Sequence, residues 1–257
     1  MIEPYYQVEF TAIACKFEIN INEINLISLA IENQASTLIP LNSGIAKTGE
    51  QKLNVKLLAL PGQEFLNPQA VFSYKIKVYE MKYGFELKTT IEGHAFPPVD
   101  PSKKLKVMSH DQIFNAEVPY TIDVWQKGTL LTDVDDLDEK LKRAYSRIAS
   151  HIRNKEYEKL KMELANREKT MATSMYLSKE DSEARLNSLV KDIEDGFTVM
   201  PMDPTVLITI SGQGRLAAYK KLSGEPALTL FNPKTGEEIM LDLSFYIPAG
   251  KTEFVVI

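Results

Sequence analysis

The sequence predicts a chain of two parts: an all-β N-terminal half, and a C-terminal α+β half in which helices precede an antiparallel sheet. Three observations predict this order. Short segments alternate apolar and polar residues up to about residue 131, amphipathic helical patterns follow, and short apolar segments divided by glycine turns close the chain. The 257 residues suit two domains, and 44% hydrophobic residues are enough to bury a core. We place the boundary between residues 1–132 and residues 133–257.

The N-terminal half carries several short segments of strand periodicity. Alternation with a period of two places one side of a strand on a core and the other in water. Turn residues separate the segments, and the proline-rich stretch 96–101 lacks the amide donors that a central strand needs. Such a pattern is typical of a β-sandwich. The predicted strands are 17–21, 53–57, 71–79, 85–91 and 120–125.

One stretch of this half resembles galactose-binding-like jelly-roll domains. In those domains a short Pro-Leu-Asn segment precedes a glycine turn and a strand that ends at a proline. Here residues 39–45 supply the first segment, Gly49 the turn and residues 53–62 the strand, although Gly49-Glu50-Gln51 stands where Gly-x-Asn is usual. The resemblance implies a jelly-roll-like sandwich. Sugar binding would need exposed aromatic side chains, and the residues that could supply them are Tyr74, Tyr79, Tyr83, Phe85 and Trp125.

The C-terminal half begins with the acidic stretch 133–139. As a calcium loop it has Leu137 where a ligand is needed and Asp138 where a glycine is needed, so we interpret it as a helix N-terminus. Asp136 and Glu139 have the spacing of a capping box. Apolar residues at helical spacing then predict one long helix or two consecutive ones over 136–174. Ser178 and Asp181 predict a second capping box, for a helix that ends at Gly196.

Five short strands are predicted after the helices. Short links between consecutive strands imply an antiparallel meander, and helices packed on such a sheet form an α+β layer. Gly212-Gln213-Gly214 resembles the start of a dinucleotide-binding fingerprint, but the strand-like residues after it favour a hairpin turn. The predicted strands are 206–210, 215–219, 227–231, 238–247 and 253–257.

This half resembles the cystatin-like, nuclear-transport-factor-like fold, in which helices wrap a curved sheet. The resemblance rests on Tyr157-Glu158-x-Leu160 in a helix, on the Gly212–Leu216 hairpin, and on the turns at Gly224 and Gly236. Enzymes of that fold keep an aspartate and a histidine inside the cone of the sheet. The strands here offer Asp242 and no histidine, which argues against that type of activity.

Few residues of the chain are typical of catalytic or metal sites. Cys15, the one cysteine, lies in an apolar alternation, so we expect a buried, unreactive thiol without a disulfide partner. His94 and His110-Asp111 could form a metal site or an acid–base pair, but no second ligand cluster accompanies them, and we interpret them as loop residues on a polar surface. His151 lies on the long predicted helix, at a solvated or interface position. We therefore assign no catalytic, metal or cofactor-binding residue.

The net charge and the lack of targeting or membrane-spanning segments in the sequence limit the functions to be considered. The chain has 30 Lys and Arg against 35 Asp and Glu, a net charge of −5, which argues against a nucleic-acid partner. We find no secretion signal at the N-terminus and no apolar run approaching the ~20 residues that span a bilayer. These features predict a cytoplasmic protein, or a periplasmic one if a leader has been removed.

The combination of a jelly-roll-like and a cystatin-like domain is similar to immunity proteins of secreted interbacterial toxins, such as those delivered by type VI secretion. The resemblance implies a non-enzymatic antitoxin that binds one cognate toxin, the effector, and neutralises it. Net acidity suits the capture of a basic surface. Two alternatives stay open at this stage: a carbohydrate- or lipid-binding module acting through the β-sandwich, and a small-molecule enzyme that uses Asp242.

Overall fold

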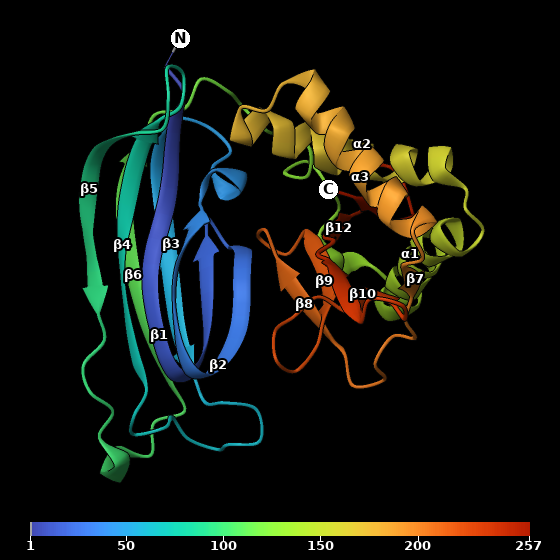
Figure 1. Cartoon of the computed structure of the whole chain (residues 1–257). Coiled ribbons are helices and arrows are strands. Elements are labelled where there is room, and N and C mark those ends of the chain that lie inside the picture. Colours follow the sequence, from blue (N-terminus) through green and yellow to red (C-terminus); the bar gives the residue numbers. More distant parts are fainter. Residues whose placement is uncertain (1) are drawn as a thin grey trace. The chain divides into compact units, whose positions relative to one another are not determined.

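The structure, a computed structural model, describes residues 2–257 and divides into two compact units. The first unit runs to Ile122 and includes Ser174–Tyr176, and the second comprises Asp123–Thr173 and Leu177–Ile257. The part up to Ile122 is built of strands, and the rest contains three helices and two small antiparallel sheets (Figure 1). This confirms the predicted order of an all-β half and an α+β half. The division falls at Ile122, whereas the sequence prediction placed it between residues 132 and 133.

The first unit is one curled antiparallel sheet of six strands. Its strand order is β5-β4-β1-β3-β6, and β2 pairs with β1 outside this path. Three-residue 3₁₀ turns, η1 (Asn42–Gly44) and η2 (Pro101–Lys103), lie in its connections. The strands are β1 (Pro4–Ile21), β2 (Ile24–Pro40), β3 (Gly49–Leu58), β4 (Val71–Glu80), β5 (Glu86–Ala95) and β6 (Val107–Ala116).

The long strand β1 bends at Ala14, so its two halves pair with different strands of the sheet. Its residues before the bend pair with β4, and those after it pair with β3. Ala14 has φ +49°, and the register with β2 shifts there, which is a β-bulge. One extra residue exchanges the two faces of a strand, so Phe10 and Phe17 both point into the core, with ring centroids 4.8 Å apart. The bulge therefore keeps the apolar side of β1 inside the curl.

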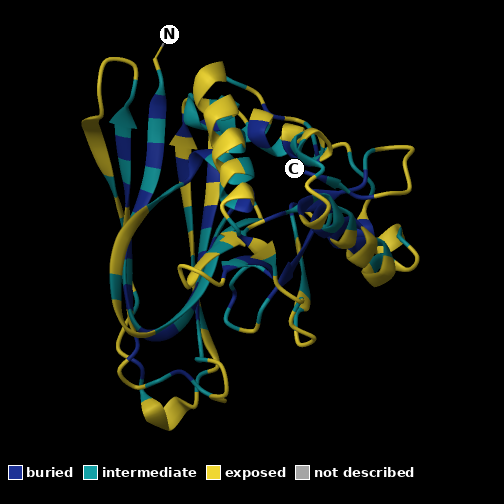
Figure 2. Cartoon of the chain, turned by 45° about the vertical axis from the view of Figure 1, so that its right-hand side comes forward, coloured by how far each residue is buried: buried dark blue, intermediate teal, exposed yellow. Residues whose placement is uncertain are grey.

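The β1–β2 hairpin turns at Asn22 and Glu23, whose φ angles of +49° and +66° are those of a type I′ turn. The strand β2 is 17 residues long and pairs only with β1 among the described strands. All 17 residues of β2 are intermediate or exposed, so its sequence lacks the alternation that marks a half-buried strand. This is why no strand was predicted there. Figure 2 shows buried and exposed residues mixed along the strands of the chain.

The predicted strand 120–125 is wrong. The chain leaves the sheet at Ala116, and a turn closes where the Gly128 amide donates to the Trp125 carbonyl at 2.8 Å. Ile122 and Trp125 are both buried, and a spacing of three residues does not fit a strand with one buried face. The aromatic and β-branched composition gave the segment strand propensity, but tertiary packing holds it as a loop.

The second unit contains η3 (Leu131–Asp133), the helices α1 (Leu137–Arg153) and α3 (Lys179–Glu194), and the helix α2 (Tyr157–Met175) up to Thr173. None of the helices in residues 2–257 is long and apolar enough to cross a bilayer.

The caps of these helices were predicted with mixed success. The capping box of Ser178 and Asp181 at α3 is confirmed, and Gly196, with φ +115°, follows that helix in the conformation of a C′ residue. The capping box predicted at Asp136 is wrong, because Asp136 adopts a left-handed conformation with φ +55° and its side chain caps no amide. Lys155, also left-handed at φ +56°, lies in the break that separates α1 from α2.

The last strands form two sheets, so the prediction of one continuous meander is wrong. One sheet has the order β11-β10-β7 and the other β13-β12-β9-β8. From β8 onward the chain changes sheets twice. It leaves the β8–β9 sheet at Pro226, which forms only an isolated bridge to Lys220 and has no amide proton to continue a ladder. It returns to that sheet between Leu241 and Phe245, so the single strand predicted over 238–247 is also wrong. The strands are β7 (Thr198–Val199), β8 (Leu207–Ser211), β9 (Leu216–Lys220), β10 (Leu228–Asn232), β11 (Glu237–Leu241), β12 (Phe245–Tyr246) and β13 (Val255–Val256).

Candidate functional site

The outer face of the curled sheet carries a polar groove of about 490 Å³ across β2, β1, β4 and β5. Strand register explains it, because Glu9 on β1 lies opposite both Leu38 on β2 and Lys75 on β4. The inward residues of the same strands are apolar and fill the core, so alternation leaves the polar residues outside. The side chains that line the outer side of the groove include Glu9, Thr11, Ser36, Leu38, Ser73 and Lys75.

Glu9 lies between two lysines in this groove. Its carboxylate is 2.9 Å from Lys75 Nζ and accepts a hydrogen bond from Lys77 Nζ at 2.7 Å. The hydrogen bond from Lys77, followed by that from Lys75, lowers the pKa of Glu9 below the ordinary value of a glutamate. Two cations around one anion leave this part of the groove with a net positive charge at neutral pH.

Hydroxyl groups lie next to this charged part. Thr11 and Ser36 face each other across β1 and β2, with their hydroxyl oxygens 2.9 Å apart, and Ser73 lies opposite Thr11 on β4. Hydroxyls both donate and accept, so they can bind polar groups of either kind. Charged and hydroxyl side chains together make a surface suited to polar recognition.

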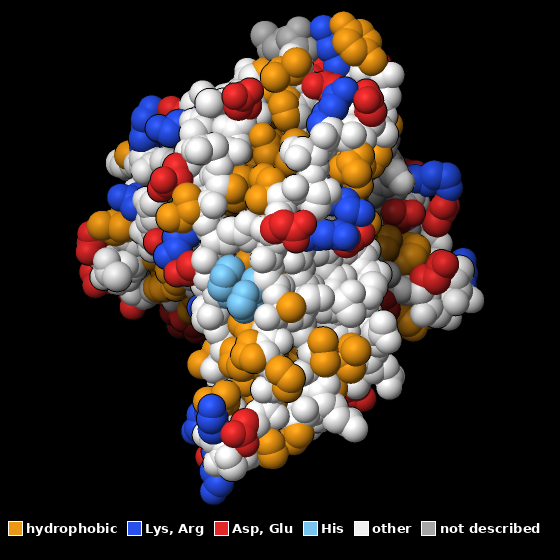
Figure 3. All heavy atoms as spheres, turned by 90° about the vertical axis from the view of Figure 1, so that its left-hand side faces the viewer, with side chains coloured by type: hydrophobic (Ala, Val, Ile, Leu, Met, Phe, Trp, Pro, Cys, Tyr) orange, Lys and Arg blue, Asp and Glu red, His pale blue; other side chains and the backbone are white. Residues whose placement is uncertain are grey.

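His94, which borders the groove, and His110 come together where β5 and β6 meet, which the sequence interpretation missed. Their register partners are the buried residues Tyr74 and Val55, so the pair lies on the inward side of the sheet. Both lie in strands, β5 and β6, so their assignment to loops is wrong. Their rings are stacked, with centroids 3.9 Å apart and planes inclined by 2°. Figure 3 shows histidine side chains gathered at the surface of this face, next to acidic and basic side chains. His110 Nδ1 is 2.8 Å from the hydroxyl of Tyr74.

An aromatic cluster lies at the β4–β5 hairpin, and we define it as Tyr5, Tyr79, Tyr83 and Phe85. Tyr79 and Phe85 are stacked with centroids 4.2 Å apart, and Tyr5 meets Phe85 edge to face at 6.0 Å. Tyr83 is 87% exposed and Phe85 56% exposed. Because Tyr5 and Tyr79 pair across β1 and β4 in step with Glu9 and Lys75, the cluster shares the sheet face that carries the groove.

Two of the five aromatic residues considered for sugar binding are unsuitable. Tyr74 and Trp125 are buried, at 6% and 7% exposure, so neither ring can stack on a ligand. Burial also raises the pKa of the Tyr74 phenol. Tyr79, Tyr83 and Phe85 remain, and the structure adds Tyr5, whose role no local sequence signal indicated.

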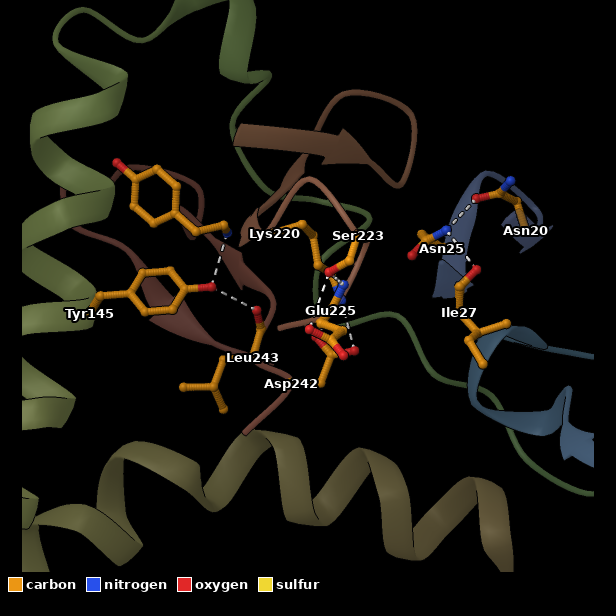
Figure 4. A network of polar contacts seen from close by, with 10 residues as sticks. Asn20, Asn25, Ile27, Tyr145, Lys220, Ser223, Glu225, Asp242 and Leu243 are labelled. Carbon is orange, nitrogen blue, oxygen red and sulfur yellow. Dashed lines mark hydrogen bonds and ion pairs between the residues drawn. The ribbon is translucent and has the colours of Figure 1, made fainter. Parts of the chain in front are cut away.

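Asp242, the enzymatic candidate, forms an ion pair with a buried lysine. Lys220 Nζ donates to its two carboxylate oxygens at 2.7 and 2.8 Å, and the lysine side chain is 10% exposed (Figure 4). Nearby, the Ser223 hydroxyl donates to the Glu225 carboxylate at 3.1 Å, and the Tyr145 hydroxyl donates to the Leu243 carbonyl at 3.3 Å. All of these contacts join residues of the second unit to one another, so they stabilise the fold of that unit.

The other residues considered for chemistry are distributed over the chain. Cys15 is buried and free, and burial raises the pKa of its thiol to about 11. His151 on α1 is mostly buried, with Nδ1 2.7 Å from the Glu156 carboxylate. Gly212 to Gly214 form a turn between β8 and β9, as predicted. Among residues 2–257, no three His, Cys, Asp or Glu side chains are placed to hold a metal ion.

Comparison with known proteins adds no relative. No protein-family model, no curated protein and no solved structure matches this chain.

Proposed function

We propose that this chain acts by binding another protein, and that the aromatic cluster is the centre of the interface. The observation that carries the proposal is the exposure of Tyr83 and Phe85 on a sheet face that also presents charged groups. Tyrosine and phenylalanine are enriched in the centres of protein interfaces, where a polar rim surrounds an apolar middle.

The surroundings of the aromatic cluster fit such an interface. Leu87, on the exposed strand β5, is 48% exposed and extends the apolar surface. Lys82 and Lys88 supply charge at its edge: Lys82 Nζ lies 4.9 Å from the centre of the Tyr83 ring, and Lys88 pairs with Glu86. Contiguous exposed apolar surface with a charged rim is the usual mark of a binding site.

The partner we propose is a secreted protein toxin that this chain neutralises. Support comes from the resemblance of the two halves to jelly-roll-like and cystatin-like domains, which we keep as part of the proposal. It also comes from the net charge of −5, which favours association with a basic protein. In this proposal the chain performs no chemical step on the toxin.

The test uses the product of the reading frame adjacent to this gene. We expect it to arrest bacterial growth when expressed alone and this chain to restore growth on co-expression. The double variant Tyr83→Ala, Phe85→Ala should weaken binding at least about tenfold in calorimetry, the range of interface anchors. Met162→Ala is the control, because Met162 is 77% exposed on α2, outside the aromatic cluster.

The outcomes separate the two parts of the proposal. A neighbouring product that neither arrests growth nor binds this chain rejects the toxin as partner. Binding that Met162→Ala weakens as much as the double variant does rejects the aromatic cluster as the interface.

A second candidate function is carbohydrate or lipid binding by the same face. It is favoured by one observation, the exposed Phe85 ring on the face that carries Glu9, Lys75 and the hydroxyls of the groove, since sugars bind by ring stacking combined with hydrogen bonds. A glycan array and a vesicle-flotation assay with wild type and Phe85→Ala test it. Binding that Phe85→Ala leaves unchanged, or no binding by the wild type, rejects this role.

A further inference from the structure

The two ends of the strand path in the N-terminal unit approach each other without forming a ladder. β5 and β6 are the first and last strands in the order β5-β4-β1-β3-β6, and no backbone pairing joins them. We call this place the β5–β6 seam and define it by His94 and Glu92 on β5 and by His110 and Gln112 on β6. Only side chains connect the two strands there.

Two contacts close the seam. The imidazole rings of His94 and His110 are stacked at 3.9 Å, and Gln112 Nε2 donates to the Glu92 carbonyl at 2.8 Å. Neighbouring rings hold the two imidazoles in this orientation. The Phe96 ring meets the His94 ring edge to face with centroids 5.0 Å apart, and the Tyr74 hydroxyl is hydrogen-bonded to His110 Nδ1. Beyond the seam, residues 86–90 of β5 are exposed, so the strand has few other contacts on its free side.

The backbone places His94 at the seam through a bulge. The β4–β5 register shifts between Tyr74 and Ile76, and Gly93 lies at this shift. A Cβ at Gly93 would lie 1.9 Å from the Tyr74 carbonyl oxygen, so only glycine allows β5 to approach β4 so closely. The bulge at Gly93 therefore helps to bring the two imidazole rings together.

We propose that the stacked His94–His110 pair is an acid-sensitive contact that holds β5 to β6 at neutral pH and releases β5 when the pair takes up protons. Two neutral imidazoles stack without repulsion, whereas two imidazolium rings with centroids 3.9 Å apart repel each other at short range. Histidine is the side chain whose ordinary pKa lies in this range, so mild acid is sufficient.

The charged groups around the pair do not cancel this effect. Burial, and secondly the His110 ring, lower the pKa of His94 in the closed seam. Hydrogen bonds from Lys77 and then Lys75 lower the pKa of Glu9, and hydrogen bonds from the Asn54 amide and then Lys52 lower the pKa of Asp111, so neither carboxylate titrates in the same range. The titratable and charged groups closest to the pair in strand register, with their ion-pair partners, are Lys52 and Lys56 on β3, Tyr74 and Lys75 on β4, Glu92 on β5, Asp111 on β6 and Glu9 on β1.

The sign of the pH effect follows from the lowered pKa of His94. Opening the seam returns this side chain to its ordinary pKa of about 6.5, so the open state binds more protons than the closed one. The seam is therefore most stable above about pH 6.5 and loses stability as the pH falls below it. One proton taken up on opening changes the opening equilibrium by at most about tenfold per pH unit.

Hydrogen exchange followed by mass spectrometry tests the proposal on the whole chain, between about pH 7.5 and about pH 5, around the ordinary histidine pKa. With the seam open, only the ladder with β4 holds β5, so β5 separates from β4 more often and its amides exchange faster. After correction for the pH dependence of chemical exchange, protection of β5 amides should fall by up to about tenfold per pH unit below about pH 6.5. Protection of β3 amides should not change, because β3 is paired on both sides, with β1 and with β6.

The matched variant is His94→Phe, which keeps an aromatic ring at the stack and removes the proton site. Its β5 protection should be independent of pH. A wild type whose β5 protection does not change with pH, or a variant that loses protection as the wild type does, overturns the proposal.

If His94→Phe does not fold, imidazole titration by NMR of the wild type decides, with His151→Gln identifying the third histidine signal. Titration of His94 and His110 in two coupled steps supports the acid-sensitive contact, and independent titration of the two rings overturns it.

Discussion

The ion pair of Lys220 and Asp242 predicts an asymmetry between two substitutions in the second unit. The lysine side chain is 10% exposed and the aspartate side chain 48% exposed, although the two charges are only 2.7 Å apart. Removal of Asp242 leaves a buried ammonium without this partner, whereas removal of the Lys220 charge leaves a carboxylate that water already reaches. The structure therefore predicts that Asp242→Ala destabilises the unit more than Lys220→Met does.

The loss of unfolding free energy expected for Asp242→Ala lies between two limits. Breaking a fully buried ion pair from one side costs about 3–5 kcal/mol, and an exposed pair contributes about 0.2–1 kcal/mol. Because one partner here is buried and the other half exposed, we expect Asp242→Ala to lower the free energy of unfolding by about 2 kcal/mol. Lys220→Met keeps most of the apolar stem and should cost less than about 1 kcal/mol.

Urea unfolding measures both values. Trp125 is the one tryptophan of the chain, it is buried, and it belongs to the second unit, so its fluorescence reports the unfolding of that unit. Asp195→Ala is the control, because the pair of Lys191 and Asp195 is exposed on both sides. Equal losses for Asp242→Ala and Lys220→Met, or a larger loss for Lys220→Met, would refute the reasoning that the buried lysine dominates.

Three further predictions concern local features. Gly93→Ala should cost about 1–3 kcal/mol or more by overpacking against Tyr74, seen as a lower midpoint of thermal unfolding; a midpoint within error of wild type would show that β5 moves freely. Ser178→Ala removes the side-chain acceptor of the Asp181 amide and should lower the stability of the second unit by about 1 kcal/mol in urea; an unchanged midpoint would contradict the cap. Cys15, with its thiol pKa raised to about 11, should react with iodoacetamide at least about a hundredfold more slowly in the native chain than in urea, measured by mass; equal rates would contradict its burial.

The elements best predicted from the sequence are those with local signals. The capping box at Ser178 and the glycine after α3 are chemical patterns within a few residues, and both are confirmed. Cys15 was expected to be buried because its neighbours alternate, and it is. The strand predicted at 120–125 failed because aromatic and β-branched composition favours strands only where a neighbouring strand is available, and none pairs with it.

The candidate site depended on contacts that sequence spacing does not reveal. His94 and His110 are separated along the chain, and neither has another histidine near it in the sequence. Local sequence therefore did not indicate that the two side chains form a pair. Their stacking follows from the curl of the sheet and from the bulge at Gly93. Tyr5 joins Phe85 for the same reason, since β1 and the β4–β5 hairpin meet only after the strands pair.

By itself the sequence determined the order of the parts: strands in the first half, then helices, then short strands. These are properties of local periodicity and turn chemistry, which act over a few residues. The sequence did not indicate β2 or β6. Tertiary structure alone decided that β1 pairs in two parts of one curled sheet, that the last strands divide into two sheets, and that two histidines meet at the β5–β6 seam. Strand register and curvature bring distant residues into contact, and both are set by the packing of the whole unit.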